Sequence, residues 1–136
     1  MEKTNREWTQ TVFLIGAVLD GLVAVVMFVP TLEAWAWGFA QPMVDPSYRF
    51  AMAFGGALMT GWTALLLWAA AKPLERRGVA PLTMVVVSGL MLAEILGMVS
   101  GFLPALRVWL LLAFQMVLLL GLALAFHWAS RPSGGR

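Results

Sequence analysis

The chain has 136 residues, of which 61% are hydrophobic and only 12% are charged, with a formal net charge of +2. An average soluble domain has about 25% charged residues, so this sequence cannot cover its apolar core with a polar surface, and the lipid bilayer must be its solvent. The absence of cysteine and the single histidine, His127, exclude disulfides, thiol chemistry and a multi-histidine metal or haem site within one chain. We therefore expect no cofactor and no metal.

Four apolar stretches are long enough to cross a membrane, and they cover residues 11–29, 50–71, 81–103 and 108–128. A membrane-spanning helix needs about 20 apolar residues. The apolar runs are continuous rather than alternating, which favours helices over barrel strands. The sequence thus predicts an all-α membrane protein with a single domain of four helices in an antiparallel bundle. The polar tail at 131–136 is expected to be disordered.

The connections between these stretches differ in length and composition. The first, residues 30–49, contains Trp35 and Trp37 and is interrupted by Pro42 and Pro46. It predicts a short interfacial helix over 32–39, which is either an aromatic anchor at headgroup depth or a lid over an outward-facing cavity. The last connection, around Pro104, is short enough to force a hairpin.

The distribution of basic residues predicts the orientation. Seven of the nine Lys and Arg residues lie in the N-terminus, the second connection and the tail, whereas only Arg49 and Arg107 lie on the other side. The positive-inside rule then predicts that both termini are cytoplasmic, and we expect the chain to lie in the inner (plasma) membrane. This placement of charge gives no reason to expect a nucleic-acid partner. Ala34-Trp35-Ala36 looks like a signal cleavage site, but the preceding run is too long, so we expect an uncleaved first helix.

Each predicted helix carries a polar side chain near its middle: Asp20, Thr60, Glu94 and Gln115. At about 1.5 Å of rise per residue, all four lie close to the membrane midplane. A carboxylate in hydrocarbon is costly and usually functional. No Lys or Arg lies inside a predicted span, and burial favours a neutral carboxyl, so we expect Glu94 to be protonated at neutral pH and to donate to Gln115 or a backbone carbonyl.

Small residues accompany these polar positions. Gly97 and Gly101 form a GxxxG pair on the face of Glu94, which predicts close helix packing in the outer half of that helix. Small-residue faces also flank Asp20 and follow the second predicted helix, where they comprise Gly16, Ala17, Ala24, Ala53, Ala57 and Gly61. The last helix is rich in leucine around Gln115, which suggests a more lipid-facing surface there.

The segment FGGALMTGWTALLLWAAAKPLERRGV, residues 54–79, resembles a pattern in small, uncharacterised prokaryotic four-helix membrane proteins. The resemblance brings no known activity. Small multidrug resistance transporters are similar in size and number of spans, and they use a first-helix carboxylate where Asp20 lies. This chain departs from them in its long Trp-rich first connection, its second acid at Glu94, and an Asp where those proteins normally have Glu.

Two functions are consistent with these features. In the first, the protein transports or binds a proton, a cation or a small amphipathic ligand. Asp20 and Glu94 bind it, Thr60 and Gln115 supply hydrogen bonds, and Trp62 supplies an apolar wall. In the second, it is an accessory subunit or assembly factor of a larger membrane complex, homo-oligomeric or bound to a partner subunit, and the acids hold helices together. An enzyme is not expected, because the chain lacks a His cluster, a Cys nucleophile and a plausible Ser–His pair.

Overall fold

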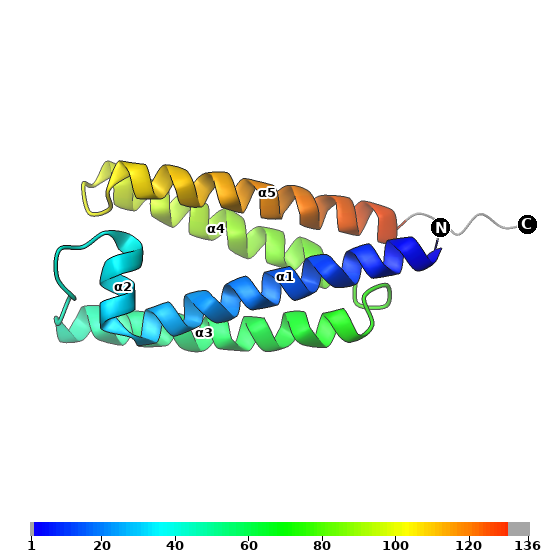
Figure 1. The fold of residues 1–136 in the computed structure, drawn as a ribbon, viewed down its shortest axis with the longest axis horizontal. Helices are drawn as coiled ribbons and strands as arrows, with labels where there is room; N and C mark the ends of the chain where they lie inside the picture. Colours follow the sequence, from blue (N-terminus) through cyan, green and yellow to red (C-terminus); the bar gives the residue numbers. More distant parts are fainter. Residues whose placement is uncertain (1, 131–136) are drawn as a thin grey trace, which may run out of the picture.

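A computed structural model of the chain describes residues 2–130, which form five α-helices (Figure 1). They are α1 (Glu2–Phe28), α2 (Pro30–Trp37), α3 (Pro46–Ala71), α4 (Val79–Val99) and α5 (Ala105–Ala129). All except the short α2 are long and apolar enough to cross a membrane. The predictions of an all-α fold and of four helices that could span a membrane are therefore confirmed. The tail predicted to be disordered, 131–136, lies outside the described residues.

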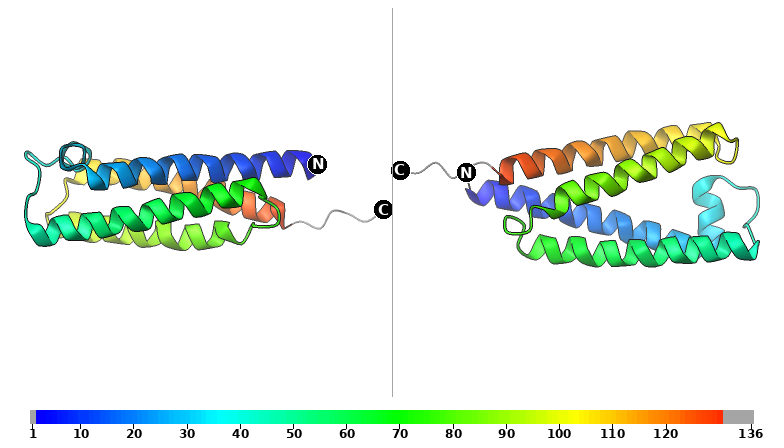
Figure 2. Two further views of the ribbon diagram at one scale, coloured as in Figure 1. Left: turned by 90° about the horizontal axis from the view of Figure 1, so that it is seen from below. Right: turned by 180° about the vertical axis from the view of Figure 1, so that it is seen from behind.

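The helices pack as two pairs, with α1 against α3 and α4 against α5, and the pairs are joined mainly by contacts between α1 and α5. Helices α3 and α4 scarcely touch. The start of α1, the end of α5 and the α3–α4 connection share one end of the molecule, here called the terminal end (Figures 1 and 2). At the opposite end, called the α2 end, α2 lies between the two pairs (Figure 2).

The core lies where α1, α3, α4 and α5 all contribute side chains. Phe13, Leu66 and Leu122 are fully buried there, and most of their buried neighbours are alanines such as Ala69 and Ala125. Small side chains let helix backbones approach closely, which supplies packing energy where lipid removes most of the hydrophobic driving force.

The first turns of α2 and α3 differ from the predicted boundaries because proline begins each helix. Pro30 begins α2, which covers Pro30–Trp37 rather than 32–39, and Pro46 begins α3 ahead of the predicted residue 50. Proline suits the first helical position, where its missing N–H would have no partner. The Asp45 side chain caps α3 by accepting a hydrogen bond from the Tyr48 N–H at 2.9 Å. Arg49 consequently lies inside a helix rather than in a loop.

Helix α4 ends at Val99, earlier than the predicted residue 103. Gly101 has φ +76°, its N–H donates to Met98 O at 3.0 Å, and the Phe102 N–H donates to Gly97 O at 2.9 Å. This is the Schellman pattern that terminates helices. The Leu103 side chain folds back onto Gly97, where an added Cβ would lie 2.9 Å from its Cδ1. The structure therefore does not bear out a helix-packing face of Gly97 and Gly101, because Gly101 lies in the turn that ends α4 and Gly97 packs against Leu103 of that turn.

Candidate functional site

The centre of the candidate site is a hydrogen bond between α4 and α5. Gln115 Nε2 donates to Glu94 Oε1 at 2.8 Å, and Glu94 is only 8% exposed. Glu94 shares a buried face of α4 with Val87, and Gln115 lies in line with the buried Leu112 and Leu122. The interpretation that α5 faces lipid around Gln115 is therefore wrong, because that side chain points into the bundle toward Glu94.

The other oxygen atoms of this pair lack hydrogen-bond donors. Glu94 Oε2 and Gln115 Oε1 are both buried, and neither has a partner among the residues that the structure describes. An unsatisfied buried acceptor costs about 1–3 kcal/mol, and more if it is charged. Two acceptors cannot bond to each other, so one proton or one cation placed here would satisfy both.

Asp20 lies on the interior face of α1, at helical spacing from the buried Phe13, Ala17 and Ala24. Unlike them, it is only half-buried, and within 2–130 it makes no hydrogen bond or ion pair. A carboxyl group with no partner on an otherwise buried stripe is unusual, because buried polar groups are normally hydrogen-bonded.

The packing of α1 on α5 places Asp20 at the height of Gln115. The rings of Trp8 and Trp128 are 5.7 Å apart and fix the relative register of these two helices. Asp20 follows Trp8 by twelve residues and Gln115 precedes Trp128 by thirteen, which is about 18 Å and about 20 Å along the two helices. Asp20, Glu94 and Gln115 thus occupy one layer of the molecule, here called the polar layer, although Asp20 does not bond to the other two.

Thr60 and Trp62 make no hydrogen bond to the residues of the polar layer. Thr60 is exposed on α3, and its hydroxyl donates to Gly56 O at 2.9 Å within its own helix. Trp62 Nε1 donates to Thr83 Oγ1 at 3.2 Å and so links α3 to α4. Of the five predicted site residues, the structure joins Glu94 and Gln115 by a hydrogen bond and places Asp20 at the same depth. Thr60 and Trp62 do not bond to these three.

Sequence reasoning missed a second buried carboxylate, Glu33 on α2, which is 1% exposed. It accepts hydrogen bonds from the Tyr48 hydroxyl and from Arg49 Nη1, and Arg49 Nη2 also reaches Phe28 O at 3.4 Å. Its partners lie 15 and 16 residues further along the chain, too far for helical spacing to reveal the contacts. The only usable signal was that the connection 30–49 contains two acids, Glu33 and Asp45, and one base, Arg49, that could pair.

Two hollows lie at the ends of the molecule, and a smaller groove reaches the height of the polar layer at Leu19 and Phe114. One of about 500 Å³ lies at the α2 end, another of about 400 Å³ lies at the terminal end beside Arg6 and Lys72, and a groove of about 130 Å³ runs between α1 and α5. Asp20, Glu94 and Gln115 line none of these three. Residues 2–130 contain no cluster of three or more His, Cys, Asp or Glu that could hold a metal ion.

Comparison with known proteins adds no assignment: no protein-family model, no curated protein and no solved structure matches this chain. The four long apolar helices indicate a multi-pass membrane protein, and any narrower role is argued from the polar layer.

Proposed function

We propose that the chain is a small transporter, not an enzyme, whose polar layer of Asp20, Glu94 and Gln115 binds and exchanges a proton or a small cation. In this proposal the four long helices form an antiparallel bundle in the plasma membrane with both termini in the cytoplasm, following the distribution of basic residues. The observation that carries the proposal is the pair of buried, unsatisfied oxygen atoms on Glu94 and Gln115.

A single proton completes the hydrogen bonding of this pair. Bound to Glu94 Oε2, it donates to Gln115 Oε1, while Gln115 Nε2 continues to donate to Glu94 Oε1. The acid and the amide then form a closed, neutral pair that suits a low-dielectric interior. Asp20, at the same height and half-exposed, is the group that exchanges the proton with water. A cation would instead have to be held by oxygens from all three residues.

Flux measurements in liposomes test this function. The parent, Asp20→Asn and Glu94→Gln are reconstituted, and uptake is followed with a proton-sensitive dye and separately with a sodium gradient. We expect either substitution to reduce the flux at least about tenfold, the effect of losing an interaction of about 1.4 kcal/mol. Glu75→Gln, which changes an exposed carboxylate at the terminal end, is the matched control. Equal flux in all four proteins, with folding intact, would remove the transport proposal.

A second role, that of an accessory or assembly subunit, is supported by a different observation. Ala53, Ala57 and Gly61 form an exposed stripe along α3, and a Cβ added at Gly61 would meet nothing within 4 Å. Stripes of small residues are typical of close helix–helix contacts in membranes. In this role the stripe binds a second copy or another subunit, and Gly61→Leu abolishes crosslinking or copurification without changing flux. Glu94→Gln would leave that association intact.

A further inference from the structure

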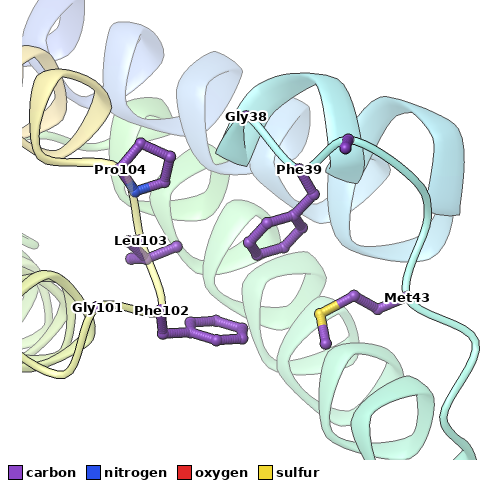
Figure 3. Close-up of a pocket in the computed structure, with 8 residues that line it drawn as sticks. Gly38, Phe39, Met43, Gly101, Phe102, Leu103 and Pro104 are labelled. Carbon is purple, nitrogen blue, oxygen red and sulfur yellow. The ribbon is translucent and has the colours of Figure 1, made fainter.

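The hollow at the α2 end is a pocket lined almost entirely by apolar side chains (Figure 3). The α2–α3 connection supplies Phe39 and Met43, and the turn between α4 and α5 supplies Phe102 and Leu103. Figure 3 shows the two phenyl rings and the Met43 side chain directed toward one another, and the ring centroids of Phe39 and Phe102 are 5.2 Å apart. The volume of about 500 Å³ is large enough for part of an extended apolar molecule.

A cation lies at the edge of this pocket. Gly38 and Pro104 belong to its lining, and a Cβ added at Gly38 would lie 3.5 Å from Arg107 Cγ and 3.6 Å from Arg107 Nε. The Arg107 guanidinium is 6.0 Å from the centre of the Trp35 ring. Arg107 is exposed, and it forms neither a salt bridge nor a side-chain hydrogen bond within the described part of the chain.

The local structure does not otherwise account for the charge of Arg107. Arg107 lies in the first turn of α5, where a helix dipole disfavours a cation. The nearby acids are occupied, because Glu33 bonds to Tyr48 and Arg49, and Asp45 caps α3. The carboxyl end of α2 can attract the guanidinium, but it supplies none of its N–H groups with a hydrogen bond.

We propose that this pocket binds one anionic phospholipid, whose phosphate pairs with Arg107 and whose acyl chain packs in the pocket against Phe39, Met43 and Phe102. Guanidinium groups bind phosphate through two parallel hydrogen bonds. The pocket lies at the ends of the long apolar helices, close to Trp35 and Trp37. Tryptophan at such a position is typical of the depth of the lipid headgroups. A lipid combines the required negative charge with an apolar tail and is already present there.

The absence of cysteine permits a site-specific test. Ala40, which is exposed and lines the pocket, is replaced by Cys and labelled with an environment-sensitive fluorophore. The labelled protein in non-ionic detergent is titrated with short-chain phosphatidylglycerol, phosphatidylcholine and inorganic phosphate. We expect half-saturation by phosphatidylglycerol at a concentration about tenfold lower than by phosphatidylcholine, because the choline ammonium of phosphatidylcholine already neutralises the phosphate that Arg107 would bind. Phosphate alone should give no response.

Three variants separate the contributions of charge and pocket. Arg107→Gln should reduce the preference for phosphatidylglycerol to less than about twofold, and Arg107→Lys should retain part of it. Met43→Trp should obstruct the space beside the two phenyl rings and abolish the response. The same label at Leu74→Cys, which lines the hollow at the terminal end, reports other lipid contacts and should not respond to Arg107→Gln. Circular dichroism monitors folding.

Equal responses to the two lipids, or a preference that survives Arg107→Gln, would overturn the proposal. A full response to inorganic phosphate would also overturn it, since that result assigns a phosphate site without a tail. If Arg107→Gln does not fold, Met43→Trp replaces it as the test. A preference for phosphatidylglycerol that persists in Met43→Trp would then contradict the proposal.

Discussion

Glu33 is the most deeply buried charged residue in the described chain, and it holds α2 onto the start of α3 through Tyr48 and Arg49. Removing one member of a buried ion pair leaves the other without compensation, which costs more than the pair contributes. Because the Arg49 side chain is 24% exposed, water offsets part of that cost. The Glu33–Arg49 pair is therefore expected to be the strongest single polar contact at the α2 end.

Glu33→Gln should lower the free energy of unfolding by about 2–3 kcal/mol, the value of hydrogen bonds to charged groups. Tyr48→Phe, which removes one of the two donors to this carboxylate and leaves Arg49 paired with it, should cost about 1.5 kcal/mol. Unfolding by SDS in mixed micelles measures both. The control is Glu75→Gln, whose exposed pair with Lys72 should contribute less than about 0.5 kcal/mol. A similar loss in both glutamine variants would contradict the structural role of Glu33.

The Glu94–Gln115 pair gives a second residue-scale prediction. Gln115→Leu removes the Glu94 hydrogen bond and should destabilise the protein by about 1–3 kcal/mol. Glu94→Leu should cost a similar amount, because the amide of Gln115 is then unpaired. The double variant removes all four polar atoms and should lie within about 1 kcal/mol of the parent. A double-mutant cycle in the same unfolding assay measures this coupling, and strictly additive losses would contradict it.

At the scale of helices, the sequence predicts that a helix is present better than it predicts the residues at which the helix begins and ends. Long apolar runs reveal the four membrane helices, since only length and composition are required. The end of α4 was missed because the sequence of a GxxxG pair is the same in two situations. The glycines can pack against another helix, or one of them can adopt a positive φ that ends the helix, as Gly101 does. Likewise the leucines around Gln115 gave no sign of which face meets α4. Both features depend on where the chain turns and which neighbour it then meets.

The terminal turn of α4 provides the element-scale prediction. Gly101→Ala should lower stability by about 1–2 kcal/mol, because an L side chain disfavours φ +76°. Gly89→Ala is the matched control: Gly89 lies within α4, where an added Cβ meets nothing within 4 Å, and alanine there should be neutral or slightly stabilising. Thermal unfolding in detergent compares the two, and an equal loss would argue against the Schellman turn.

At the scale of the whole molecule, two arginines of the α3–α4 connection bind the carboxyl ends of helices. Arg76 donates to Trp68 O on α3 and its guanidinium lies 3.8 Å from the Trp68 ring centre, while Arg77 donates to Ala129 O on α5 at 3.3 Å. The positive-inside rule assigns these charges to membrane orientation. They also satisfy carbonyl groups that a helix leaves unpaired at its end.

The proposed orientation predicts opposite labelling of the two ends. Glu75→Cys at the terminal end should react with an impermeant maleimide only in inside-out vesicles, whereas Val44→Cys, exposed at the α2 end, should react in intact cells. The chain has no native cysteine to interfere. The reverse pattern would contradict the positive-inside assignment, and labelling of both sites from one side would contradict the four-span topology.

In the proposed function, the polar layer holds a proton on Glu94 at neutral pH. Infrared difference spectroscopy of the reconstituted protein tests it most directly. We predict a protonated carboxyl band at pH 7 that disappears in Glu94→Gln and changes frequency in Gln115→Leu, because the band reports the Glu94 hydrogen bond. Absence of that band in the parent, or its persistence in Glu94→Gln, would contradict the claim.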